Sequence, residues 1–318
     1  MRSASSLCWK NGVENLMNVS DVKPTLTDTQ VLDFCKRGYM IFPAVVPPEI
    51  NRRAVEYVNE IVVGRDDLRA KRRSGEVEFF LPLIEESWFV DHVLLNEHAA
   101  GAVRSLLGRD FALPTIISDH RAETPMASPG SWHRDGNFVH NKQVNYLEVF
   151  YHPLDVPMSM GPTAILPGSH HLASGPVGHY GRLKGAVHFA PPEALAGSIL
   201  VMSYNLWHRR TASTAKGHRH LFRFNYWRTT QPVRDWVIEP DFDLRTANYE
   251  FFDRPNTRPP TRDCNDAAEM YFWLAGRHDD FAVMGGQSWP GPQRGLDGAV
   301  QGFPGDRTDQ RTWGDAKE

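Results

Sequence analysis

The order of hydrophobic and polar positions divides the chain into a helical first third and a β-rich middle. The apolar residues Ile50, Ala54, Val58 and Ile61 recur on one face of a 3.6-residue period. Two prolines stand directly before this run, and proline loses nothing at the first position of a helix. A helix is therefore predicted from about residue 48 onward.

An earlier helix is predicted over about residues 28–36. Thr27 stands three residues before Gln30, the pattern that satisfies two free amides at the start of a helix. Gly38 can adopt the left-handed conformation that ends a helix. Residues 39–42 are apolar and predict a strand directly after it.

After a third predicted helix, over about residues 96–107, the pattern changes to β. Short apolar runs are separated by glycine and proline at residues 112–117, 146–151, 198–202 and 221–227. The helices precede the strands and do not alternate with them. The predicted fold class is therefore mainly β with flanking helices, a double-stranded β-helix or cupin-like jelly-roll barrel.

One folded domain is predicted over residues 1–284, followed by a tail. Its parts are N-terminal helices over about 20–108, a jelly-roll core over about 109–230 and a C-terminal elaboration over 231–284, which includes a short aromatic helix at 267–274. That helix fits either packing on the barrel or contact with a second copy of the chain, so a homo-oligomer is left open. The Gly/Pro-rich tail at 285–318 has too few large apolar residues to form a core of its own.

Composition narrows the classes of partner. The 318 residues are 41% hydrophobic and 23% charged, as in ordinary globular proteins, and the net charge of −3 disfavours nucleic acid. No apolar run approaches a membrane span, and three dispersed cysteines without an apolar leader favour the cytoplasm. The basic run at 69–73 is interpreted as a solvated helix end, in preference to an anion site.

His133 and Asp135, two residues apart, are the first candidates for chemistry. On a strand their side chains would project from the same face. Iron(II) oxygenases bind their metal with two imidazoles and one carboxylate and leave the other positions open. His208, 75 residues later at the end of an apolar run, is the candidate for the second imidazole.

Four segments in order resemble the phytanoyl-CoA dioxygenase family of non-haem Fe(II)- and 2-oxoglutarate-dependent oxygenases. They are the His-x-Asp motif in residues 131–136, the run at 161–171, the strand ending in His208, and Gly217-His218-Arg219. The resemblance extends from about Gly38 to Trp227. It implies the jelly-roll fold and a catalytic metal site of His133, Asp135 and His208.

The resemblance also implies Fe(II), 2-oxoglutarate as co-substrate, and O2. In the family an arginine eleven residues after the distal histidine pairs with the far carboxylate of 2-oxoglutarate, and that position is Arg219 here. A guanidinium fork suits a dicarboxylate. The implied activity is oxidation of a small organic substrate with release of succinate and CO2. Hydroxylation leads, while desaturation and ring formation stay open.

Three other residues are weaker candidates for binding 2-oxoglutarate. Tyr151 occupies a place where many relatives carry an aromatic residue near the co-substrate, although packing in the core is an equal alternative. The family often has glycine and serine after the distal histidine, whereas two arginines stand here. The assisting hydroxyl is therefore assigned to Thr211 or Ser213.

The histidines near these motifs receive other interpretations. His170 and His171 follow a Pro-Gly-Ser turn, so a turn or surface role is favoured over metal ligation. His218 and His220 flank Arg219 and would face away from it on a strand, outside the metal site.

The substrate is predicted only as a small molecule. Candidate aromatic residues for its pocket indicate that an apolar or aromatic molecule could be held: Phe79, Phe80, Trp88, Phe89, Phe138 and Trp207. Related halogenases have a small residue at the position of Asp135, so its carboxylate leaves no place for chloride. Two alternatives stay open: a catalytically idle binding or scaffold protein, and a cupin-type enzyme that uses the same ligands without 2-oxoglutarate.

Overall fold

The structure is a computed structural model that describes residues 19–62, 70–73, 76–135, 142–172, 186–247 and 260–279. The predicted tail at 285–318 lies outside these ranges. None of the described helices is long and apolar enough to cross a bilayer.

Helix α1 (Asp28–Arg37) begins and ends close to the predicted residues. The Thr27 hydroxyl accepts from the Gln30 N–H and the Gln30 side chain accepts from the Thr27 N–H, which confirms the capping box. The helix ends at Gly38, whose φ of +81° is left-handed. A Cβ atom there would lie 2.4 Å from the His170 ring, so the position requires glycine.

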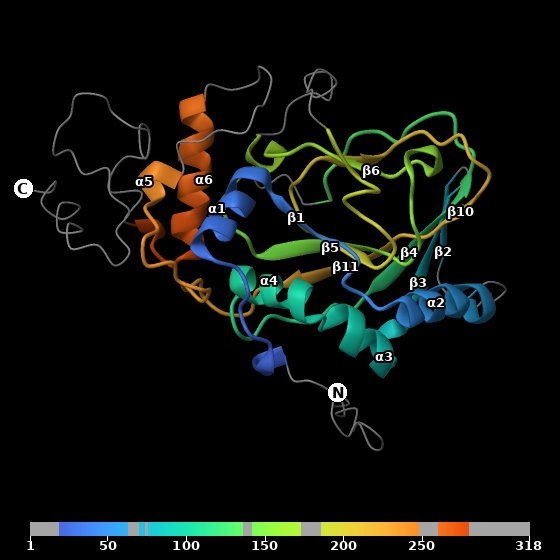
Figure 1. Cartoon of the computed structure of the whole chain (residues 1–318), viewed down its shortest axis with the longest axis horizontal. Helices are drawn as coiled ribbons and strands as arrows, with labels where there is room; N and C mark the ends of the chain where they lie inside the picture. The colour runs from blue at the N-terminus through green and yellow to red at the C-terminus, as the bar shows by residue number, and fades with distance from the viewer. Residues whose placement is uncertain are drawn as a thin grey trace, which may run out of the picture.

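The other N-terminal helices lie along one face of the large sheet (Figure 1). They are α2 (Pro48–Glu56), η2 (Tyr57–Val62), η3 (Leu83–Glu85), α3 (Ser87–Phe89), η4 (Val90–Leu94) and α4 (Glu97–Leu107). Helices α2 and α4 match the predicted ones, and Pro48 and Asn96 stand at their starts. The segment from η3 to η4 was not predicted, because each of its turns is too short to give a periodic signal.

Two sheets, in which every strand pair is antiparallel, form the β part. The eight-stranded sheet runs β1-β8-β5-β11-β4-β3-β2, with β10 also paired to β4, and the three-stranded sheet runs β7-β6-β9. The strands are β1 (Tyr39–Phe42), β2 (Ala70–Arg73), β3 (Glu76–Leu81), β4 (Ile117–Thr124), β5 (Tyr146–His152), β6 (Thr163–Ile165), β7 (Val187–Phe189), β8 (Ser198–Ser203), β9 (His208–Arg210), β10 (Gly217–Arg219) and β11 (Phe222–Trp227).

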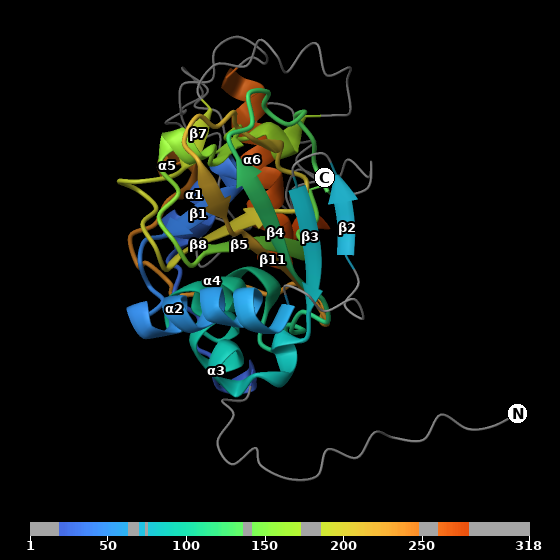
Figure 2. The same cartoon turned by 90° about the vertical axis from the view of Figure 1, so that its right-hand side faces the viewer.

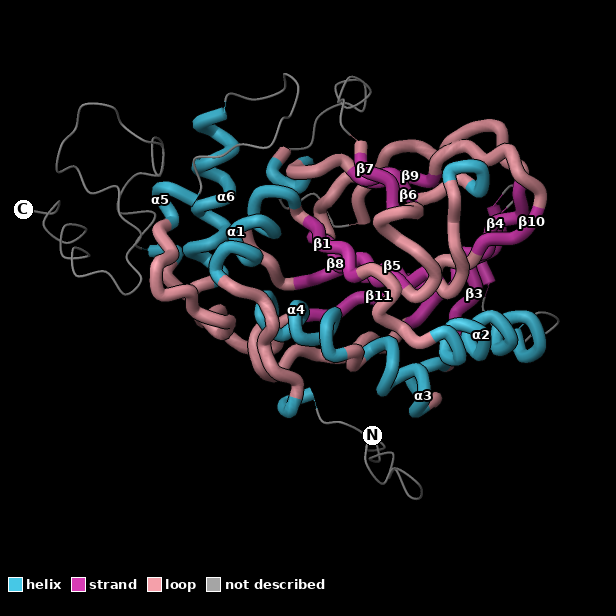
Figure 3. The backbone as a smooth tube through the Cα atoms, viewed as in Figure 1, coloured by secondary structure: helices cyan, strands magenta, loops and turns pink. Residues whose placement is uncertain are grey.

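The small sheet lies on the face of the large sheet opposite to the helices (Figures 2 and 3). This is the double-stranded β-helix arrangement, although the two sheets do not join into a closed barrel. Strand alternation sorts each strand of the large sheet between two cores. Tyr151 and Phe222 point to the helices, whereas Phe150 and Leu200 point between the sheets. The space between the sheets is therefore the place for the predicted site.

Two sequence predictions about strands are corrected. Residues 70–73 of the basic run form β2 and not a helix end, because their backbone pairs with β3 in an antiparallel ladder, with Lys71 opposite Glu78 and Arg73 opposite Glu76; Arg69 lies outside the described residues. The strand predicted at 112–117 begins only at Ile117, after a single bridge from Ala112 to Trp227. Pro114 lacks the N–H that a ladder needs.

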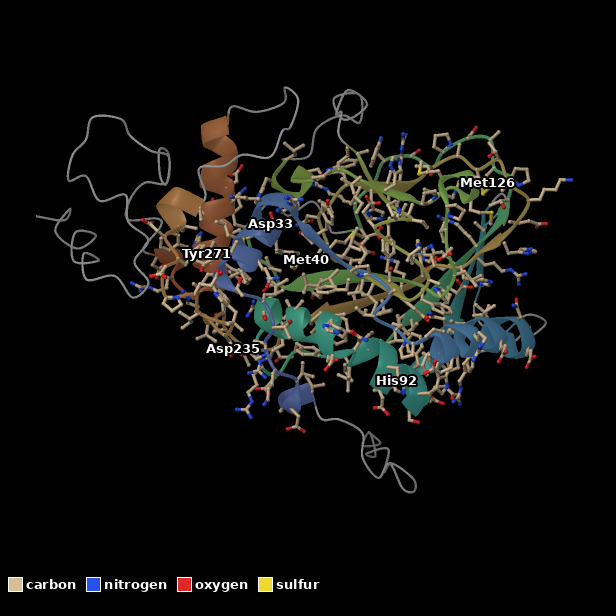
Figure 4. The ribbon with its side chains drawn as sticks, viewed as in Figure 1. Asp33, Met40, His92, Met126, Asp235 and Tyr271 are labelled. Carbon is tan, nitrogen blue, oxygen red and sulfur yellow. The ribbon has the colours of Figure 1, made fainter. Side chains whose placement is uncertain are left out.

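A buried carboxylate joins the first helix to the C-terminal elaboration. There α5 (Leu244–Ala247) and α6 (Pro260–Leu274) follow the sheets, and α6 lies beside α1 (Figure 1). Asp28 is fully buried and accepts hydrogen bonds from Arg234, Trp236, Tyr271 and the Glu239 N–H. Figure 4 shows Tyr271 at this end of the molecule. Burial opposes ionisation, but these four donors lower the pKa of Asp28.

Replacing Asp28 by asparagine is expected to cost on the order of 3 to 5 kcal/mol of unfolding free energy, because the substitution removes one charge of the buried ion pair between Asp28 and Arg234. The control is Asp33→Asn on the same helix. Asp33 pairs with Arg37 at the surface, and its loss should cost less than about 1 kcal/mol. Urea unfolding at pH 7 measures both. Equal losses would contradict the role given to Asp28.

Candidate metal centre

A backbone bridge brings the two candidate histidines together. The His133 N–H donates to the His208 carbonyl at 3.0 Å, and the His208 N–H donates to the His133 carbonyl at 2.9 Å. His133 lies in this single bridge and not in a longer strand. His208 begins β9 in the small sheet and does not end the preceding strand, because β8 stops at Ser203 and the chain turns there, with the Leu206 N–H bonded to the Ser203 carbonyl.

The ligand atoms of His133, Asp135 and His208 all lie within 4.8 Å of one another. The Asp135 carboxylate lies 4.0 Å from Nε2 of His133 and 3.8 Å from Nε2 of His208. Each imidazole directs Nδ1 at a backbone carbonyl, that of Ser131 at 2.9 Å and that of Leu206 at 3.1 Å. Nδ1 then carries the proton and Nε2 is left as a ligand atom. Two imidazoles and one carboxylate in this orientation fit a divalent metal ion such as Fe(II).

Burial and nearby charge set the protonation states of the ligands. Burial, followed by the His133 ring, lowers the pKa of His208 to about 4. Burial alone would raise the pKa of Asp135, but hydrogen bonding with Glu148 and the charges of Arg223 and the two histidines lower it to about 2. In the metal-free protein near neutral pH, His208 is neutral and Asp135 ionised, as a metal requires.

A cavity of about 620 Å³ is lined by the three candidate ligands together with Arg219. Arg219 is buried at the end of β10, where its partner across the ladder is Ala122 of β4. Its Nη1 donates to the Gly161 carbonyl at 2.5 Å. The structure thus places a buried guanidinium and the metal-ligand set at one cavity.

Residues 34–221, more than half of the chain, match the family model of phytanoyl-CoA dioxygenase (PhyH). The chain belongs to the phytanoyl-CoA dioxygenase family. This membership gives the general class of the protein, the Fe- and 2-oxoglutarate-dependent oxygenases, and confirms the resemblance found in the motifs. No curated protein sequence matches the chain.

Solved structures share the family fold. The non-heme alpha ketoglutarate dependent epimerase SnoN from nogalamycin biosynthesis is 14% identical, with a TM-score of 0.50 over 63% of this chain and 80% of its own. HygX from Streptomyces hygroscopicus, with nickel and 2-oxoglutarate bound, is also 14% identical, with a TM-score of 0.50 over 67% of this chain and 90% of its own. At this identity the likeness shows the fold alone.

The three weaker candidates for binding 2-oxoglutarate lie outside the lining of the cavity. Tyr151 points away from the cavity toward the helices, and its hydroxyl donates to Asn51 at 2.6 Å, so it is a core residue. The Thr211 hydroxyl donates to the Pro162 carbonyl, and the Ser213 hydroxyl accepts from the Met126 N–H. Neither lines the cavity.

Two hydroxyl-bearing residues do line the cavity, Ser131 and Thr163, and Thr163 lies on β6. The sequence offered a signal for it, since Thr163 lies in the matched run that begins at Gly161. Thr163 was not predicted, because spacing from the distal histidine indicates Thr211 and Ser213.

The other histidines lie outside the three-ligand group, but His170 and His171 are buried and not at the surface. Both rings direct Nε2 at the Cys35 carbonyl, at 3.1 and 2.7 Å. His220 is also buried, 2.7 Å from Asp119, and His218 is exposed. A turn or surface role was predicted for His170 and His171. Both lie in the turn η6 (Ser169–His171), and only the surface alternative is wrong, because a Pro-Gly-Ser turn does not reveal what covers it.

The predicted aromatic pocket is also corrected. Trp88 and Phe89 pack in the core against the helices, and Trp207 packs on Leu166. Phe80 does not line the cavity. Phe138 and the side chain of Phe79 fall outside the described part of the structure. The lining instead carries two polar side chains from neighbouring strands that sequence reasoning did not select: Glu78 and His120.

Acid is expected to destabilise the metal-free protein through His208. An unfolded histidine takes up a proton near pH 6.5, but the folded His208 does so only near pH 4, so stability falls as the pH drops from 6.5 to 4. Between pH 7 and pH 5 this contribution is about 2 kcal/mol. Urea unfolding with a chelator present should show that His208→Gln loses less stability over this range than the wild type. Parallel pH profiles would contradict the assignment.

Proposed function

We propose that this protein is an Fe(II)- and 2-oxoglutarate-dependent dioxygenase that hydroxylates a small polar substrate and releases succinate and CO2. The observation that carries the proposal is the convergence of His133, Asp135 and His208 at a cavity that Arg219 also lines. Membership of the phytanoyl-CoA dioxygenase family agrees with this donor set.

His133, Asp135 and His208 would hold the iron, since both Nε2 atoms and the carboxylate face a common point. Bound Fe(II) would supply the activation of O2, with one oxygen atom passing to the substrate as a hydroxyl and the other to succinate as 2-oxoglutarate loses CO2. The chain itself holds the ligands and limits water. The ring of Phe150 packs edge-on against His208 at 5.4 Å and keeps that side apolar.

Arg219 would bind the far carboxylate of 2-oxoglutarate. A buried guanidinium can give a carboxylate two parallel hydrogen bonds, which provide both strength and orientation. The strand pairing of β10 with β4 and the bond to the Gly161 carbonyl hold the side chain at the cavity. Thr163 is the nearby candidate for the assisting hydroxyl because it lines the same space.

The lining favours a polar substrate over the apolar one expected from the sequence. Phe150 and Leu221 are the only apolar side chains among the described lining residues. Arg134 and Arg209 also contribute to the wall, but their guanidinium groups stack on Trp207 and Trp132.

Glu78 and His120 are therefore the clearest polar groups for a substrate to meet. They lie 3.2 Å apart on neighbouring strands, and both are partly exposed. Together they can accept and donate hydrogen bonds to a hydroxyl- or amine-bearing molecule.

Asp135 favours oxygenation over halogenation. A carboxylate at this position occupies the ligand place that a halide would need. Desaturation or ring formation would use the same ligands and differ only in how the substrate is held, so product analysis separates them from hydroxylation.

The test of the proposal is anaerobic addition of Fe(II) and 2-oxoglutarate to the purified protein. A weak visible charge-transfer band is expected, and aerobic incubation should form succinate. A protein without the band and without succinate would be the scaffold alternative. Substrate turnover that continues when 2-oxoglutarate is omitted would indicate a cupin-type reaction instead.

Alanine at His133, Asp135 or His208 is expected to abolish succinate formation, because each substitution removes one of three ligands. His218→Ala is the control, since this exposed histidine lies outside the ligand group. Iron content, succinate yield and circular dichroism are measured together. A ligand variant that keeps near-normal iron and turnover would remove that residue from the site.

Arg219→Ala is expected to raise the 2-oxoglutarate concentration needed for half-maximal turnover by at least about 100-fold. An unpaired buried carboxylate costs on the order of 3 to 5 kcal/mol. About 1.4 kcal/mol corresponds to a tenfold change in the dissociation constant. Lysine should restore only part, because it cannot make the two-pronged contact. The control is again His218→Ala on the same strand. An unchanged requirement in Arg219→Ala would refute the role.

A further inference from the structure

A second arginine at the site, Arg223, contacts the candidate ligand Asp135 directly. Its Nη2 lies 2.8 Å from Oδ2 of Asp135, and its Nε lies 2.5 Å from Oε1 of Glu148. Nη1 is 4.0 Å from Oε1 of Glu78. Two edges of one guanidinium thus engage two carboxylates on different segments.

Strands β11 and β5 position Arg223 and Glu148 without help from loops. Arg223 lies in β11 between Phe150 of β5 and Ser118 of β4, and it projects into the space between the sheets. Glu148 lies on the same face of β5, and its side chain is only 1% exposed. A buried carboxylate requires a charged or hydrogen-bonding partner, and Arg223 supplies it. Glu148 in turn fixes the plane of the guanidinium.

Asp135, by contrast, lies outside the named strands. The nearest ladder contact along the chain is the single bridge at His133. The backbone therefore leaves the orientation of the Asp135 carboxylate to side-chain contacts. Arg223 lies 2.8 Å from Oδ2, which also faces Nε2 of His208 at 3.8 Å, while Oδ1 lies 4.0 Å from Nε2 of His133.

We propose that Arg223, held by Glu148, is a positioning residue that orients the Asp135 carboxylate so that one of its oxygens is presented as a metal ligand. The inference rests on the proposed function, since it concerns the same metal site. Lysine could not replace it fully, because an ammonium is a point charge and lacks the rigid fork that spans both carboxylates. Partners that orient metal ligands in this way are typically worth 10- to 100-fold in metal affinity.

Co(II) binding to the metal-free protein tests the proposal without any turnover. Co(II) is titrated into wild type, Arg223→Gln, Arg223→Lys, Asp135→Ala and the control Arg121→Gln. Arg121 lies on the neighbouring strand β4, where alternation puts its side chain on the other face of the sheet. The affinity and the visible Co(II) absorption bands, which report ligand number and geometry, are recorded. Circular dichroism checks the fold of each variant.

Arg223→Gln is expected to weaken Co(II) binding by about 10- to 100-fold and to alter the bands. Arg223→Lys should fall between glutamine and wild type, and Arg121→Gln should match wild type. Arg223→Gln with an affinity within threefold of wild type, or tighter, and with unchanged bands would overturn the inference. If the glutamine variant does not fold, wild-type affinity and bands in Arg223→Lys would overturn it equally.

The two proposals fail in different ways. Equal Co(II) binding by wild type and Asp135→Ala would contradict the metal site itself. Loss of binding in Asp135→Ala but not in the folded Arg223 variants would contradict only the positioning role.

Discussion

The reciprocal backbone hydrogen bonds between His133 and His208 are the interaction on which the site depends. They join segments 75 residues apart, so that the backbone alone fixes the distance between the two imidazoles. The imidazoles are then turned by local carbonyls, those of Ser131 and Leu206, so that Nε2 of each faces Asp135. The two candidate ligands are thus positioned by backbone hydrogen bonds, which do not depend on the type of side chain. The side chains contribute only the donor atoms.

Alternation along the strands decides which nearby residues face the candidate metal site and which pack in the core. In β5, Glu148 and Phe150 face the space between the sheets, while Tyr151 faces the helices and bonds to Asn51. One residue of displacement separates a partner of the metal site from a core residue. The same rule places Arg223 beside Asp135 and puts Phe222 in the helical core.

A structural feature could be predicted when its signal lies in neighbouring residues of the sequence or in the motif spacing of the family. The capping box at Thr27, the glycine at position 38 and the strand runs at 146–151, 198–202 and 221–227 are local, and the structure agrees with them. The His-x-Asp motif came from the two-residue spacing of its side chains, and Arg219 came from the family's spacing after the distal histidine. They meet at one cavity. Tyr151 faces the helices, in line with its core alternative, and motif spacing carries no information on which face of the strand a residue takes.

Other features depended on contacts that the local sequence does not contain. The hydroxyls of Thr211 and Ser213 are bonded to backbone groups of Pro162 and Met126, far away in the chain. His170 is buried at a place where its ring faces the Cys35 carbonyl of α1. A turn motif cannot reveal this contact. Glu148 looked like one polar residue in an apolar run, and only the pairing of β5 with β11 explains it.

The three ligands lie at a boundary between apolar and polar surroundings. The His208 side chain is 5% exposed and packs on Phe150, beside the core between the sheets, whereas that of His133 is 51% exposed. The core side excludes water, and this burial lowers the pKa of His208. The open side is the side of His133, where Glu78 and His120 supply polar groups. In the proposed function, a substrate that enters there would meet hydrogen-bonding partners before it meets the candidate ligands, so recognition and chemistry would be carried by different strands.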